Sequence, residues 1–405
     1  MNDILFAAQW TQHNAYLQTS LSTIIQSPFH TSFEKIQHCF NRGLTQAFGT
    51  LLFPLKSFTR SMVLPSSQIS QEAYHQIAVG WQQRWENPFP IGRQAQLIQT
   101  YEPIILEMIT PDGTLIKGVW YKHRSSTDAN LPTILCFNHN RVHAKSTEWE
   151  WLLKKGLSSP QPFHVIVFDY RRNPSQADDL LVDGETVIQT ALTKLGIAPA
   201  NLHLFGYSIG GAVSAILANL HPDLGRIVNR SSFSSLEKLL QHSPEAHETL
   251  GDSLFFFVPK PLLPLILNRR TKWITAMIST GLGWNLDPSY ALKKIKNRLL
   301  VVYHPQDRLI PPALGAIAVN GMTSSTLAMR FKPTVNSQAS SFDYHLAPLH
   351  LFEDSQKQNA TYRILNFILG RTLFSPKPSH PRKHYLITPQ GKITQGLRMH
   401  VGQIF

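Results

Sequence analysis

A serine stands between two glycines, one two residues before it and one two residues after it: Gly206, Ser208 and Gly210. A serine hydroxyl can attack an acyl carbonyl when a sharp turn from a strand into a helix holds its side chain clear of the backbone, and small residues at those two places prevent clashes within the turn. The apolar run 202–205 precedes the serine, and the small-residue stretch 210–220, of helical character, follows it. The pattern therefore predicts Ser208 as a nucleophile at the carboxyl end of a strand.

A nucleophilic serine needs a general base near neutral pH, which a histidine oriented by a carboxylate provides. After a turn of this kind, the acid and then the histidine follow along the chain. Asp307 comes just after the apolar run 299–303 and is the predicted acid. His345 and His350 both precede the helical stretch 360–369. We predict His345 as the base, with His350 as the alternative.

The elements that must position these residues alternate between short apolar runs and helical stretches. Residues 104–108 and 115–121 flank the turn signal Thr-Pro-Asp-Gly and predict a hairpin. The further runs that indicate strands are 133–137, 163–168, 202–205, 226–228, 299–303 and 326–331, and helical stretches between them include 184–195 and 210–220. Fully apolar strands that alternate with helices predict an α/β fold with a buried, mostly parallel sheet. Reactive groups gather at the carboxyl ends of such strands.

Three regions divide the chain. Residues 1–100 form an N-terminal helical region, 101–370 the α/β domain, and 371–405 a basic tail, while residues 232–290 interrupt the alternation as a small helical cap insertion. In the N-terminal region, apolar residues recur at helical spacing: Phe33, Ile36, Phe40, Leu44 and Phe48. We expect this helix to pack on the main domain, with an interfacial amphipathic helix as the alternative.

Composition limits the classes of partner. The chain of 405 residues is 42% hydrophobic and 16% charged, which is typical of a globular protein with a sizeable core. Its net charge of +13 is compatible with anionic surfaces. The tail 371–405 carries only basic charges, and is either a solvated tail or a docking strip for anionic lipid or a partner. Basic and aromatic residues do not alternate as in nucleic-acid binding modules, so no nucleic-acid partner is expected.

No metal or cofactor site is predicted. The two cysteines, Cys39 and Cys136, form no framework, and His139 and His143 have no third ligand nearby in the sequence. The start of the chain does not resemble a secretory signal, and the longest apolar stretch, 254–267, is broken by prolines and falls short of the ~20 residues that span a bilayer. We expect a cytoplasmic or peripheral membrane protein, with secretion by a route without a cleaved signal as the alternative.

From about residue 105 to 369, the sequence resembles the α/β-hydrolase family, in particular its membrane-associated, bud-emergence-like serine hydrolases and related bacterial hydrolases. The matching motifs occur in the order of the family: Asp-Tyr-Arg at 169–171, a helix at 183–195, the serine turn, the lead-in 284–298, Asp307 with Ile310-Pro311, and His345 with Pro348-Leu349. The resemblance implies that Ser208, Asp307 and His345 are nucleophile, acid and base. It also implies hydrolysis of carboxylic esters, thioesters or amides without a cofactor.

The groups that stabilise an oxyanion are less regular. The main-chain N–H of Ile209 opens the helix after the serine and is one predicted donor. The family's His-Gly-Asn reads Asn138-His139-Asn140 here, so we assign the second donor to the main-chain N–H of Asn140 or Arg141. A side-chain amide of Asn138 or Asn140 is a further candidate donor. The family's Asp-Tyr-Arg-Gly-x-Gly-x-Ser is also altered, at residues 169–175.

These observations predict a serine hydrolase, esterase- or lipase-like, that cleaves an ester or thioester of a hydrophobic or lipid-like acyl group. The apolar insertion is the reason for expecting a hydrophobic substrate. The alternative is a fold that has lost catalysis and acts as a membrane- or protein-interaction module, such as a secreted bacterial effector. The altered oxyanion loop and the N-terminal region favour that alternative.

Overall fold

The computed structural model describes most of the central part of the chain. The described residues are 94–125, 131–139, 149–171, 174, 176–242, 283–321, 326–331, 344–345 and 349–370, with the strands β11 (Tyr385–Ile387) and β12 (Ile393–Gln395) in addition. The predictions for residues 33–55, for the apolar middle of the cap insertion and for the oxyanion residues Asn140 and Arg141 lie outside this part. Of the N-terminal region only α5 (Gln94–Thr100) is described, and of the tail only β11 and β12, which pair antiparallel.

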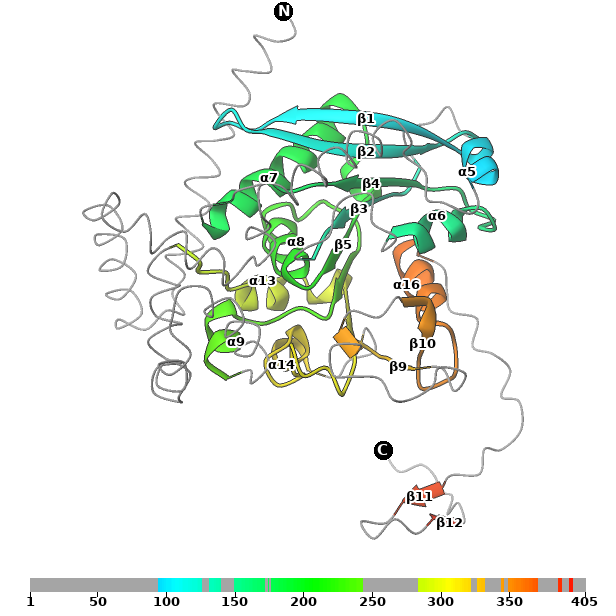
Figure 1. The fold of residues 1–405 in the computed structure, drawn as a ribbon, viewed down its shortest axis with the longest axis vertical. Helices are drawn as coiled ribbons and strands as arrows, with labels where there is room; N and C mark the ends of the chain where they lie inside the picture. The colour runs from blue at the N-terminus through cyan, green and yellow to red at the C-terminus, as the bar shows by residue number, and fades with distance from the viewer. Residues whose placement is uncertain are drawn as a thin grey trace, which may run out of the picture.

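An eight-stranded sheet in the order β1-β2-β4-β3-β5-β6-β7-β8 forms the centre of the molecule (Figure 1). Its strands are β1 (Tyr101–Ile109), β2 (Leu115–His123), β3 (Thr133–Phe137), β4 (His164–Phe168), β5 (Leu202–Tyr207), β6 (Ile227–Arg230), β7 (Leu299–Tyr303) and β8 (Thr326–Ala328). β1 and β2 form an antiparallel hairpin, β2 is antiparallel to β4, and all pairings from β4 to β8 are parallel. The predicted α/β-hydrolase fold, with a mostly parallel sheet between helices, is confirmed.

Helices cover both faces of the sheet, and for this reason β3, β4 and β5 are buried along their whole length. On one face the core contains residues of α7 (Ala177–Gln189), α8 (Ile209–Leu220), α9 (Leu236–His242), α13 (Ser289–Lys294) and α14 (Ala316–Asn320). On the other it contains residues of α5, α6 (Glu150–Gly156) and α16 (Ala360–Ile368). Figure 1 shows the two helical layers on opposite sides of the sheet. Strands covered on both faces need side chains that are apolar in both directions, as the short apolar runs predicted.

The hairpin turn is joined to the layer of α7 through Arg171, which follows β4. The Arg171 main-chain N–H and Nε donate to the two carboxylate oxygens of Asp183 on α7, at 2.6 and 2.8 Å, and Nη1 donates to Asp112 in the turn at 2.6 Å. Burial raises the pKa of Asp183 to about 6, against the opposing charge of Arg171. Burial alone would raise the pKa of Asp112 too, but hydrogen bonds from Thr110 and Arg171 lower it to about 2. Through Arg171, the Asp-Tyr-Arg segment therefore links the end of β4 to α7 and to the hairpin turn.

Two element predictions need correction. The run 326–331 is not one strand: β8 ends at Ala328, and β9 (Arg330–Phe331) pairs with β10 (Phe352–Glu353) in a separate two-stranded sheet. The neighbouring strand β7 ends at Tyr303, whose carbonyl accepts from Met329 N–H at 2.8 Å, so the chain beyond that point has no partner in the main sheet. The helix predicted from residue 184 starts earlier, at Ala177, and its last turn widens into a π-helix, Thr190–Lys194.

Short helical turns complete the described part: Pro199–Asn201, Lys296–Arg298 and Leu349–Leu351. Within the described ranges, no helix has the length and apolar character needed to cross a bilayer. The cap insertion is described only at its two ends, 232–242 and 283–290. Its extent and the domain boundaries remain predictions.

Candidate active site

The serine predicted as nucleophile occupies the turn between β5 and α8. Ser208 has φ 54° and ψ −122°, a strained conformation for a residue with a side chain. Its N–H donates to the carbonyl of Arg230 on β6 at 2.9 Å, and its own carbonyl accepts from Gly211 N–H at 2.9 Å. Main-chain hydrogen bonds on both sides of Ser208 therefore hold the strained backbone in place.

The two glycines of the turn are required by close backbone approach. A Cβ on Gly206 would lie 2.5 Å from the carbonyl oxygen of Gly210 and 2.6 Å from Cα of Gly211. A Cβ on Gly210 would lie 2.5 Å from the carbonyl oxygen of Asn138. The turn thus packs directly against the chain at the end of β3, where the oxyanion loop begins.

The structure brings Ser208, His345 and Asp307 together. His345 Nε2 lies 3.2 Å from Ser208 Oγ, and His345 Nδ1 lies 2.8 Å from Asp307 Oδ2. The second carboxylate oxygen, Asp307 Oδ1, accepts from Ile310 N–H at 3.0 Å. His345 is 1% exposed and Asp307 3% exposed, so the contact between these two side chains is shielded from water. With an ionised carboxylate at Nδ1, the neutral imidazole carries its proton there, and Nε2 is free to accept from the serine hydroxyl.

The alternative base is placed differently. His350 lies in the 3₁₀ turn Leu349–Leu351 with an exposed side chain, and the hydrogen bonds to Ser208 and Asp307 come from His345. The arrangement favours His345 over His350.

Of the predicted oxyanion donors, the structure describes Ile209. Ile209 is the first residue of α8, a helix of 12 residues, and its N–H belongs to the unpaired first turn next to the serine. Asn140 and Arg141 fall outside the described residues. The Asn138 side chain contacts other groups: Nδ2 donates to the carbonyl of Phe168 at 2.5 Å, and Oδ1 accepts from Trp149 Nε1. Its buried amide links the start of the loop after β3 to the end of β4.

A second histidine belongs to the loop of the acid. The His304 ring stacks on that of Tyr344 with centroids 4.4 Å apart, and His304 Nδ1 accepts from Gln306 N–H at 3.1 Å. Burial lowers the pKa of His304 to about 4, although the charge of Asp307 opposes this shift. His304 therefore packs the loop of Asp307 against Tyr344, the residue before His345. Because its ring is neutral, it adds no positive charge beside Asp307.

Sequence reasoning missed the part played by Tyr207, the residue before the nucleophile. Its hydroxyl donates to the main-chain carbonyl of His345, and its ring contacts those of His139 and His345. The aromatic residue is visible in the serine motif, but nothing in the sequence indicates a partner 138 residues away.

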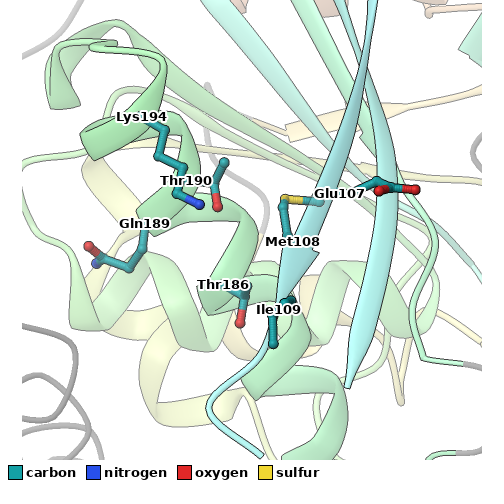
Figure 2. A pocket seen from close by; sticks show the side chains of 7 residues that line it. All are labelled: Glu107, Met108, Ile109, Thr186, Gln189, Thr190 and Lys194. Carbon is teal, nitrogen blue, oxygen red and sulfur yellow. The ribbon is translucent and has the colours of Figure 1, made fainter. Parts of the chain in front are cut away.

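The structure also has a cavity that is lined by none of the candidate catalytic residues. It has a volume of about 190 Å³. It is lined by Glu107, Met108, Ile109, Thr186, Gln189, Thr190 and Lys194, from β1, α7 and the π-helical turn (Figure 2). In the part of the chain that the structure describes, no group of three or more His, Cys, Asp or Glu side chains is placed to hold a metal ion.

Comparison with known proteins finds a relative that matches over a short segment, and remote structural neighbours. No family model matches the sequence. The uncharacterized protein YfhR of Escherichia coli K12 is 32% identical over 117 residues, which are 26% of this chain and 38% of the relative. The chain therefore matches well under half the length of this relative.

Solved structures similar to the chain include acetyl xylan esterase 1 from a Thermoanaerobacterium species, with a TM-score of 0.41 and 17% identity over 56% of this chain and 75% of that one. An esterase of Pyrococcus furiosus gives a TM-score of 0.37 and 16% identity over 55% and 76%. An acetyl xylan esterase from a Paenibacillus species gives a TM-score of 0.43 and 12% identity over 69% and 92%.

Proposed function

We propose that this protein is a serine hydrolase that cleaves carboxylic esters or thioesters through an acyl-enzyme. The observation that carries the proposal is the continuous chain of hydrogen bonds from Asp307 through His345 to Ser208, at 2.8 and 3.2 Å. The strained backbone of Ser208 supports it, because strain of this kind persists only where the surrounding structure maintains it, and it gathers at functional sites.

The geometry suits acyl transfer step by step. Ser208 Oγ attacks the carbonyl carbon of the substrate while its proton passes to His345 Nε2. Asp307 stabilises the imidazolium that forms, and the oxygen that gains negative charge accepts from Ile209 N–H and from a second main-chain N–H, which we assign to Asn140 or Arg141. The bond to the alcohol or thiol then breaks, and the leaving group takes the proton from His345. Water attacks the acyl-enzyme with His345 as its base, which releases the acid and restores the serine hydroxyl.

The nature of the acyl group is a further part of the proposal. The apolar stretch 254–267 of the cap insertion favours a hydrophobic or lipid-like acyl chain, as in esterases and lipases. A series of p-nitrophenyl esters from acetate to dodecanoate tests it: kcat/KM should rise with chain length, and equal turnover of short and long chains would count against a hydrophobic acyl site.

The acyl-enzyme itself is the sharpest test of the reaction type. After brief exposure to a p-nitrophenyl ester and acid quenching, the intact mass of the protein should increase by one acyl group, located on the peptide that contains Ser208. The Ser208→Ala variant should show no such increase. A folded wild-type protein that neither turns over an ester nor acquires the mass would favour the alternative, a hydrolase fold that acts as an interaction module.

Two further predictions from the sequence are also proposals. They are the likeness to the bud-emergence-like subfamily and a peripheral association of the basic tail 371–405 with anionic membranes. Sedimentation with phosphatidylserine vesicles at low and physiological salt tests the second, because attraction between a basic segment and an anionic surface weakens with salt.

A further inference from the structure

We propose that Tyr207 is a positioning residue, whose hydroxyl fixes the general base in place by hydrogen bonding to the main chain of His345. The inference rests on the proposed function, because it assigns a role within the same site. The hydrogen bonds among the side chains of Ser208, His345 and Asp307 do not fix the main chain of His345. The hydroxyl of Tyr207 contacts that main chain.

Tyr207 is the last residue of β5 and lies directly before Ser208. It is 0% exposed and packs with Phe205 in the core on one face of the sheet, whereas Leu204 belongs to the core on the other face. This alternation is the ordinary geometry of a strand. It directs the phenol into the interior beneath the site, on the side of the sheet from which α16 and β10 pack.

The hydroxyl of Tyr207 donates to the carbonyl oxygen of His345, and the two rings lie 5.6 Å apart at an interplanar angle of 36°. His345 is therefore held at three points. Its Nδ1 contacts Asp307, its Nε2 contacts Ser208, and its main chain is tied to the neighbour of Ser208. Only the third contact fixes the backbone from which the imidazole projects.

The Tyr207 ring is itself fixed. The guanidinium of Arg230 lies over it, 4.0 Å from the ring centroid, and the ring of His139 meets it at 4.4 Å in an edge-on arrangement. Arg230 is paired with Tyr207 across the parallel strands β5 and β6, and its carbonyl accepts the N–H of Ser208. A cation over an aromatic face is attractive, more so when both groups are buried, as here.

Through these contacts, Tyr207 connects three loops of the site. Tyr207 precedes the nucleophile, touches His139 at the start of the oxyanion loop, and binds the main chain of the base. Reacting groups misplaced by about 1 Å can lose ~100-fold in rate. Removing the tether should therefore impair the chemical step far more than substrate binding.

Tyr207→Phe removes the hydroxyl and keeps the ring. Tyr101→Phe is the matched control, since Tyr101 is also fully buried in the same core and its hydroxyl has no hydrogen-bond partner among the described residues. We expect kcat for a p-nitrophenyl ester to fall about 10- to 100-fold in Tyr207→Phe with KM changed by less than about threefold. Tyr101→Phe should match the wild type. Replacing Tyr207 by 4-aminophenylalanine, which keeps a donor at the same place, should restore most of kcat.

A spectroscopic readout separates this inference from the proposed function. The proton between His345 Nδ1 and Asp307 should give a far-downfield NMR resonance, assigned by its loss in His345→Ala. In Tyr207→Phe that resonance should shift or broaden through exchange, and in Tyr101→Phe it should not. If Tyr207→Phe and Tyr101→Phe are alike in this resonance and in kcat, the positioning role is wrong. A wild type that hydrolyses no ester would overturn the proposed function, while the resonance would still decide the role of Tyr207.

Discussion

His345 Nδ1 lies 2.8 Å from Asp307 Oδ2, and both side chains are almost completely buried. The second oxygen of Asp307 is occupied by Ile310 N–H. A carboxylate held at both oxygens cannot rotate away from the imidazole, so it fixes which ring nitrogen carries the proton. In the proposed reaction it also stabilises the imidazolium that forms when Ser208 gives up its proton.

Asp307→Asn should retain the fold and lose most of the activity. An amide at this place can present its NH₂ group to Nδ1, which then holds the wrong tautomer for accepting a proton at Nε2. We expect kcat for a p-nitrophenyl ester to fall by about 10³- to 10⁴-fold with a small change in KM. Asp223→Asn, at an exposed position, should have no effect. Activity of Asp307→Asn within about tenfold of the wild type would mean that another carboxylate orients the base.

Gly210→Ala tests the close approach of the serine turn to the oxyanion loop. Its Cβ would lie 2.5 Å from the carbonyl oxygen of Asn138, a backbone atom that cannot move without moving the loop. Overpacking of this kind is expected to lower the free energy of unfolding by about 1–3 kcal/mol. Activity should fall with it, because the loop to which we assign the second oxyanion donor is displaced.

The control for that change is Gly315→Ala, where the nearest atom to an added Cβ is the carbonyl oxygen of Ser232 at 3.3 Å. It should be much milder in both urea unfolding and ester hydrolysis. Equal behaviour of the two variants would contradict the close packing of the turn.

Protonation of His203 should lower the free energy of unfolding in mild acid. Burial lowers its pKa to about 4, and its Nδ1 accepts from Arg226 N–H at 2.8 Å, which requires the neutral ring. In the unfolded chain the ring takes up a proton near its ordinary pKa of about 6.5. The contribution of the neutral ring is therefore fully present above about pH 6.5 and is lost as the pH falls towards 4, by up to about 3 kcal/mol.

Urea unfolding between pH 7 and 4 measures this loss. His203→Gln should reduce the dependence of the free energy of unfolding on pH relative to the wild type, and His242→Gln, at the exposed end of α9, should not. The dependence is reduced rather than abolished, because burial also lowers the pKa of His304 to about 4. Asp183 acts in the opposite direction, since its pKa is raised to about 6 and its contribution is lost as the pH rises. An unchanged slope in His203→Gln would rule out the neutral buried ring.

The local elements were predictable where the apolar pattern alone decides them. β3 and β7 begin and end at the predicted residues, because each is a largely apolar run flanked by polar residues or a proline. The run 326–331 shows the limit of that reasoning. Its division into β8 and β9 depends on where β7 ends and on the arrival of β10 from a distant part of the chain.

The same distinction applies to the site. The proximity of Ser208, Asp307 and His345 was predictable, because their types and their order along the chain match a known chemical requirement. The occupied amide of Asn138 and the tether from Tyr207 to His345 were not, because both are contacts between distant segments that no local pattern specifies. Such contacts position the candidate catalytic groups and take no direct part in the proposed reaction.

The measurement that tests the central claim most directly is labelling by a fluorophosphonate probe, which reacts with an activated serine. The purified wild type should be labelled, Ser208→Ala should not, and His345→Ala should be labelled far more slowly. His350→Ala should be labelled at the rate of the wild type, because the hydrogen bond to Ser208 Oγ comes from His345. A folded wild type that fails to react, or a label that persists in Ser208→Ala, would contradict the claim that Ser208, His345 and Asp307 form a working catalytic triad.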